Sequence, residues 1–104
     1  MLVETTSKGM VYGLNSFTIV DKKSGEEKGL IDIYYIYPNS VDNAHRVGWT
    51  NGHTFVAFSD KIWNGLKDIL LKQCEIKFKL EPDFKDSTRY SSRLVSVNDI
   101  VIKQ

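Results

Sequence analysis

Apolar and polar residues alternate along several short runs of this chain, and a period of two residues is typical of β-strands. The clearest run is residues 74–81, CEIKFKLE, in which apolar positions extend from Cys74 to Leu80 and charged residues lie between them. Successive side chains of a strand point to opposite faces, so this run predicts a strand with one buried and one wet face. Lys77 and Lys79 belong to the wet face.

The first half of the chain predicts three more strands joined by polar segments. Residues 8–20 are rich in β-branched and aromatic side chains, and Gly13 within them predicts a bulge or a sharp bend. Pro38 ends the second run, because proline cannot donate a hydrogen bond to a sheet. The expected order is a strand at 8–20, a hairpin loop at 21–29, a strand at 30–37, a long connection at 38–52 and a strand at 53–58.

Residues 59–73 change from the period of a strand to that of a helix. Their apolar side chains recur at i, i+4, i+7 and i+8 and form one stripe: Ile62, Leu66, Ile69 and Leu70. Ser59 or Asp60 supplies an N-cap, and Lys72 suits the negative C-terminal end. The remaining elements are the strand at 74–81, a polar loop at 82–92 and a last strand at 93–103, with a kink near Asn98 and Asp99.

Three strands, a helix and two further strands follow one another over residues 1–104, which fit a single domain. This is the order of the OB-fold, a small five-stranded Greek-key barrel. The long first strand also fits, because it must bend at Gly13 to serve both halves of such a barrel. The sequence therefore predicts a mainly β fold of OB type with one helix between strands 3 and 4. Other small barrels and α+β sheets share this order.

The second strand contains the tyrosine-rich run GLIDIYYIYPNS, residues 29–40. Its alternation divides the side chains into two sets: Ile31, Ile33, Tyr35 and Tyr37 on one face, and Asp32, Tyr34 and Ile36 on the other. An unpaired carboxylate is costly to bury, so the face of Asp32 is expected to be the wet one. Tyr34 is then an exposed ring, and Tyr35 belongs to the core.

Composition narrows the functional classes only slightly. The net charge of +1 comes from 14 basic and 13 acidic residues, whereas nucleic-acid binders are usually more basic; binding nevertheless depends on where the charge lies. Cys74 is the only cysteine, so an internal disulfide is impossible. The N-terminus lacks a signal-peptide pattern, and no apolar run approaches the roughly 20 residues that cross a bilayer. A cytoplasmic location is expected.

Catalytic chemistry has little support in the sequence. His45 and His53 are not spaced for a zinc site, and Cys74 lies on the apolar side of its strand, as a structural thiol would. Nucleophile turns and glycine-rich phosphate loops are absent from the sequence. We therefore expect neither an enzyme nor a bound metal or cofactor.

Binding of single-stranded nucleic acid has more support, because it needs aromatic rings for base stacking and cations near the phosphates. The candidate residues are Tyr12, Tyr34, Trp49 and Phe55 on or near the first three strands, Lys77 and Lys79, and Phe84, Lys85, Arg89, Tyr90 and Arg93 in and after the 82–92 loop. The hairpin loop adds Lys22, Lys23 and Lys28. Each group also has a purely structural alternative: Tyr12 and Phe55 as core residues, Trp49 as a plug of the barrel end, and the lysines as solubilising charges.

These features together resemble the small single-stranded-DNA-binding proteins of bacteriophages and mobile elements. The resemblance rests on size, element order, the Y-G-x-N-S-F pattern at 12–17, the tyrosine-rich second strand and the loop of rings and cations. It implies an OB-type barrel, often a homodimer, that serves DNA replication or recombination. The chain ends in VIKQ, so recruitment of partners through the acidic tail of the cellular bacterial proteins is not expected.

Two hypotheses follow. The first is a non-enzymatic protein that binds single-stranded DNA with little sequence preference. The second is a small protein-interaction module, such as a phage-encoded inhibitor or an assembly subunit, with Tyr34, Ile36, Trp49 and Tyr90 as interface anchors.

Overall fold

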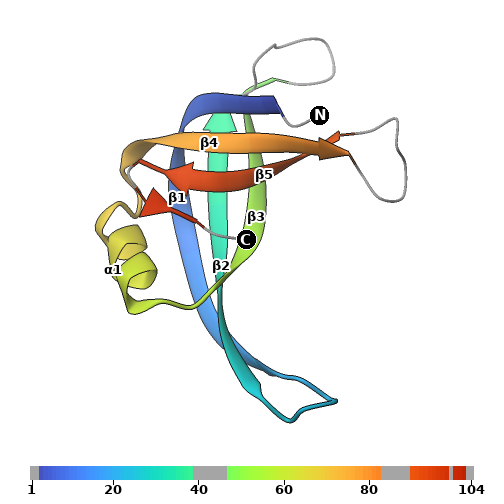
Figure 1. Ribbon diagram of the computed structural model, residues 1–104. Helices are drawn as coiled ribbons and strands as arrows, with labels where there is room; N and C mark the ends of the chain where they lie inside the picture. Colours follow the sequence, from blue (N-terminus) through green and yellow to red (C-terminus); the bar gives the residue numbers. More distant parts are fainter. Residues whose placement is uncertain (1–2, 39–46, 83–89, 99, 103–104) are drawn as a thin grey trace.

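The computed structural model describes residues 3–38, 47–82, 90–98 and 100–102 of the 104-residue chain. Within these ranges the chain forms six strands and one helix (Figure 1). They are β1 (Val3–Val20), β2 (Glu27–Pro38), β3 (Trp49–Ala57), α1 (Asp60–Asp68), β4 (Gln73–Pro82), β5 (Tyr90–Val97) and β6 (Ile100–Val101).

All six strands belong to one antiparallel sheet with the order β3-β2-β1-β4-β5-β6. The mainly β fold with one helix between β3 and β4 is confirmed. The sixth strand was not expected, so the prediction of five strands is wrong in number. Among the described residues no ladder joins β3 to β5 or β6, and the sheet is open there.

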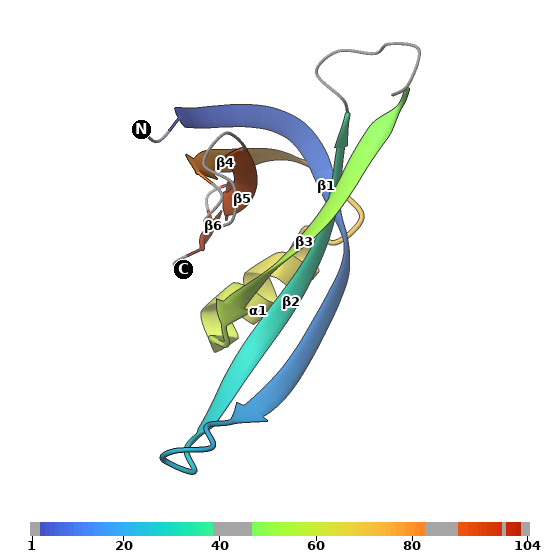
Figure 2. The same ribbon diagram turned by 90° about the vertical axis from the view of Figure 1, so that its right-hand side faces the viewer.

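The long first strand belongs to both halves of the sheet. Its first part, from Val3 to Met10, pairs with β4, and its second part, from Met10 to Val20, pairs with β2. The register with β2 shifts between Val11 and Gly13, which marks a β-bulge. β1 curves strongly between its two pairings (Figure 2), as the internal glycine predicted.

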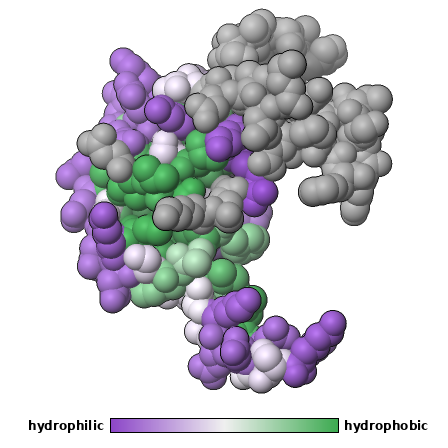
Figure 3. Space-filling model, in the orientation of Figure 1, coloured by the Kyte–Doolittle hydropathy of each residue, from purple (hydrophilic) through white to green (hydrophobic). Residues whose placement is uncertain are grey.

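The hydrophobic core lies on the concave side of this bent sheet, where α1 also packs (Figure 2). Its buried side chains come from the alternating positions of the strands and from the helix: Val11, Ile31, Ile33, Tyr35, Val56, Leu66, Cys74, Ile76, Phe78, Leu94, Val97 and Ile102. The predicted inner faces of β2 and β4 are therefore confirmed wherever the side chains are described. Apolar surface is also visible near the centre of the face that Figure 3 shows. Val101 of β6 is 67% exposed.

Several element boundaries differ from the predictions because tertiary contacts set them. β1 starts at Val3 rather than at residue 8, since its polar first residues pair with β4. The helix ends at Asp68 rather than at residue 73. Leu71 adopts a φ of 62° and donates its N–H to the carbonyl of Val11, 2.9 Å away, which directs the chain into β4.

The predicted kink near Asn98 is a tight reversal. Asn98 has a φ of 52°, and β6 folds back onto β5 through pairs such as Val97 with Ile100. Asparagine tolerates this left-handed conformation better than most residues do. β3 likewise begins earlier than predicted, at Trp49 instead of residue 53.

Candidate functional site

The outer surface of β1, β2 and β3 carries a row of rings. Outward positions on β3 are fixed by its register with β2, in which His53 lies opposite Tyr34 and Phe55 opposite Asp32. The buried Val56 faces the other way, toward the core. We define the aromatic face as the six outward side chains Tyr12, Phe17, Tyr34, Trp49, His53 and Phe55.

Five of these rings contact one another in sequence across the three strands. The centroids of Tyr12 and Tyr34 are 6.1 Å apart, and Tyr34 stacks on His53 at 5.5 Å with an interplanar angle of 16°. Phe55 meets His53 edge-on at 5.5 Å and Phe17 edge-on at 5.7 Å. The rings thus form a connected row that begins and ends on β1.

The exposure of these rings decides between the alternatives that the sequence left open. Tyr12 is 40% exposed and Phe55 is 49% exposed, so neither belongs to the core. Trp49 is 56% exposed on the same face of β3, and the prediction that it lies in a connecting loop is wrong. Tyr34 is half-buried rather than fully exposed. An exposed apolar surface of this kind is a mark of an interaction site.

A bulge in β1 lets both Val11 and Leu14 face the core while Tyr12 lies on the outer face. Val11 is buried in the core and Leu14 also packs against it, although a regular strand would direct residues three apart to opposite faces. Tyr12 and Gly13 absorb the additional residue. The ring of Tyr34 covers Gly13, where an added Cβ would meet its Cδ2 at 3.4 Å. Such packing of an aromatic ring over a glycine stabilises a bent sheet.

Asp32 corrects one expectation from the sequence. It lies on the outer face, as predicted, but it is only 5% exposed. Its Oδ1 atom is 3.0 Å from Nδ1 of His53, and its hydrogen bond with Tyr34 raises the pKa of that tyrosine. The expectation of a wet Asp32 assumed an unpaired carboxylate, whereas hydrogen-bonded partners offset the cost of burial.

His53 and Phe17 are the two residues of this face that sequence reasoning did not name as binding candidates. His53 was considered only as a zinc ligand. Its position two residues before Phe55 was nevertheless a signal that the two side chains share one face of a strand. Its pairing with Asp32 depends on the register between β2 and β3, which the sequence does not encode locally.

The predicted cations that the structure describes on β4 and β5 lie apart from the row of rings. Lys77 is exposed and Lys79 half-buried on the outer side of β4, and Arg93 lies opposite Lys79 on β5. Lys77 pairs with Thr6, which lies on the order of 20 Å along β1 from Tyr12 at about 3.3 Å per residue. The lysines therefore occupy the other half of the bent sheet.

The remaining predicted residues lie outside the described residues or in the β1–β2 hairpin. Phe84, Lys85 and Arg89 lie outside the described residues, as does the side chain of Tyr90. Exposed charges of both signs, including Lys22, Lys23 and Glu26, surround the end of the β1–β2 hairpin, which projects away from the helix (Figures 1 and 2).

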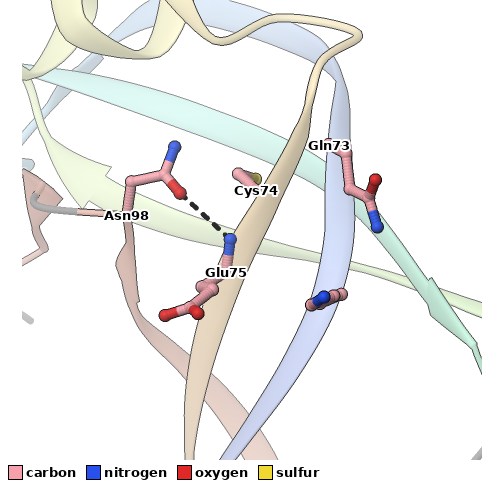
Figure 4. A pocket seen from close by; sticks show the side chains of 5 residues that line it. Gln73, Cys74, Glu75 and Asn98 are labelled. Atoms are coloured by element: carbon pink, nitrogen blue, oxygen red, sulfur yellow. Dashed lines mark hydrogen bonds between the residues drawn. The ribbon is translucent and has the colours of Figure 1, made fainter.

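Cys74 lines a shallow pocket (Figure 4). The pocket is lined by Lys8, Gln73, Cys74, Glu75 and Asn98, and the Glu75 N–H donates to Oδ1 of Asn98 at 3.0 Å. The thiol of Cys74 donates to the carbonyl of Gly9 at 3.6 Å, and burial raises its pKa. A thiol that keeps its proton is a poor nucleophile.

The described part of the chain contains neither a metal-binding cluster nor a membrane-spanning helix. It contains no group of three histidine, cysteine or acidic side chains arranged to hold a metal ion. Its helix is too short and too polar to cross a membrane.

Comparison with known proteins gives no match: no family model fits the chain, and no curated protein or solved structure is significantly similar to it. The aromatic face is therefore the feature of the molecule that points to a function.

Proposed function

We propose that this chain is a non-enzymatic protein that binds single-stranded DNA on its aromatic face, with little sequence preference. The observation that carries the proposal is the connected row of rings, together with the strong exposure of Tyr12, Trp49 and Phe55 on the same face. Each base stacked on such a ring contributes about 1–3 kcal/mol, and stacking tolerates any base because every base has a π-face.

The arrangement of strands supports an OB-type fold for this chain. β1, β2 and β3 form a meander, β1 bends to pair with β4, and the helix lies between β3 and β4. In OB-folds the face of strands 2 and 3 is the usual ligand surface, and the aromatic face occupies the corresponding position. The resemblance to phage and mobile-element proteins extends the proposal to a cytoplasmic homodimer in DNA replication or recombination.

Cations complete the proposed interface at the other half of the sheet. Lys77, Lys79 and Arg93 would contact phosphates where the DNA strand passes over the bend of β1. Near-neutral net charge limits the electrostatic part of the affinity, so stacking supplies the larger share.

The test is a titration of the folded protein with oligo-thymidine at low and at high salt, followed by intrinsic tyrosine and tryptophan fluorescence. We expect quenching on binding, since Trp49 and the tyrosines lie on the proposed surface. Affinity should fall as salt rises because phosphate contacts release counterions. Unchanged fluorescence and no complex at low salt would refute the proposal.

A protein-interaction module is the second candidate. It is favoured by the distance between the rings and the lysines, because Trp49, Phe55 and the half-buried Ile36 form a surface with little charge. Tyrosine and tryptophan anchors are typical of such interfaces. Binding to a protein through this surface would depend weakly on salt, which separates the two candidates.

A further inference from the structure

His53 occupies the middle of the aromatic face. It lies on β3 with Tyr34 stacked against its ring and Phe55 at its edge, and its side chain is 53% exposed. Any strand of DNA stacked on these rings passes next to this imidazole.

The buried carboxylate of Asp32 fixes the orientation of the imidazole. A carboxylate accepts hydrogen bonds, so the Nδ1 atom at 3.0 Å carries the hydrogen. Nε2 is then an acceptor in the neutral ring and a donor in the protonated ring. Protonation changes the net charge of the Asp32–His53 pair from −1 to zero.

Among the described residues, few other charged groups contact the Asp32–His53 pair. The polar and ring contacts of His53 within the described residues are with Asp32 and Tyr34 on β2 and with Phe55 on its own strand, and Tyr12 on β1 lies beyond Tyr34. The hydrogen bond with Asp32 raises the pKa of Tyr34, so this tyrosine stays neutral at physiological pH. Asp32 is therefore the one charged group among these contacts.

We propose that His53, oriented by Asp32, is a phosphate-contacting residue that makes binding of single-stranded DNA tighter as the pH falls through the range in which imidazole protonates. This inference rests on the proposed function. Above that range the pair presents a net negative charge to the DNA. Below it the negative charge is cancelled and Nε2–H becomes a charge-assisted donor to a phosphate oxygen.

The test is the affinity for oligo-thymidine from about pH 8 to about pH 5.5 at constant ionic strength, a range in which histidine is the side chain that ordinarily titrates. Wild-type affinity should rise about tenfold over this range. The His53→Gln variant should keep, at every pH, the weaker affinity that the wild type shows near pH 8, because the glutamine side chain gains no charge on acidification. His45→Gln removes the only other histidine and should behave like the wild type.

Asp32 is a positioning residue in this scheme, and Asp32→Asn tests that role. Loss of the carboxylate removes the acceptor that orients the imidazole, so the gain in affinity at acidic pH should shrink even when circular dichroism shows a folded protein. A uniform loss of affinity at every pH would mean a structural role only and would overturn this part of the inference.

The outcomes separate the two proposals. Wild-type binding that is tight but independent of pH, or a pH dependence that persists in His53→Gln, overturns the inference and leaves the proposed function intact. A pH dependence lost in His45→Gln also overturns it. Failure of the wild type to bind at any pH refutes the proposed function, and the inference with it.

Discussion

The ring of Tyr35 on β2 fills the space that a side chain at position 52 of β3 would occupy. The two residues are register partners, and a Cβ added to Gly52 would lie 2.9 Å from the Tyr35 hydroxyl oxygen and 3.0 Å from Cζ. Tyr35 is only 4% exposed and packs on Tyr37 and Phe78. The glycine therefore admits a large ring into the core beneath the aromatic face.

Gly52→Ala should lower the free energy of unfolding by about 1–3 kcal/mol, because overpacking displaces the Tyr35 ring. Gly13→Ala is the matched control, since its new Cβ would meet Tyr34 no closer than 3.4 Å, an ordinary contact. Urea unfolding measures both. Equal losses in the two variants would contradict the steric explanation.

Core and surface aromatics should respond differently to truncation. Tyr35→Ala should destabilise the protein by about 3–5 kcal/mol, as loss of a buried ring does. Phe55→Ala should change stability little and weaken oligo-thymidine binding by about 1–3 kcal/mol, the contribution of one stacked base. Val101→Ala on β6 is the control, an exposed apolar residue away from the aromatic face. Similar weakening by Phe55→Ala and Val101→Ala would exclude a specific stacking surface.

The lysines of β4 should contribute to the salt dependence. The double variant Lys77→Gln/Lys79→Gln should reduce the slope of log affinity against log salt by about 1 for each phosphate that is no longer neutralised. Lys61→Gln/Lys67→Gln on α1 removes the same charge from the helix and should leave the slope unchanged. If both pairs change the slope equally, the effect is one of overall charge, and β4 is not part of the interface.

Alkaline pH should weaken the fold through two buried acids. Burial raises the pKa of Tyr35 above 10.0 and that of Cys74 above 9.0. Below these values both groups are protonated in the folded and unfolded chains, so their contribution to stability is fully present. Above them the unfolded chain ionises first, and stability is lost as the pH rises toward the folded-state pKa values.

Urea midpoints at about pH 8 and about pH 10.5 measure this loss, which should be smaller in a Tyr35→Phe/Cys74→Ala variant. An equal loss in that variant and in the wild type would assign the effect to other groups.

The alternation of apolar and polar residues correctly predicted which side chains of β2 and β4 face the core. The faces of β4 followed from CEIKFKLE, and the inward Ile31, Ile33 and Tyr35 followed from the same rule on β2. The first residues of β1, VETTS, were not predicted as a strand, because they form one only by pairing with β4. The burial of Asp32 was not predicted either, because its partner His53 is 21 residues away and contacts it only through the register of β2 and β3.

The bulge at Tyr12 and Gly13 bends β1 without changing which neighbouring side chains face the core. The additional residue lets Val11 and Leu14 both face inward, and the alternation on either side of it is undisturbed. A chain shorter by one residue at this point would keep the same side chains on the same faces but would lose the device that bends β1. Insertions and deletions here would thus change the curvature of the sheet and the length of its outer surface. The alternation of apolar and polar residues on either side of the bulge would stay the same.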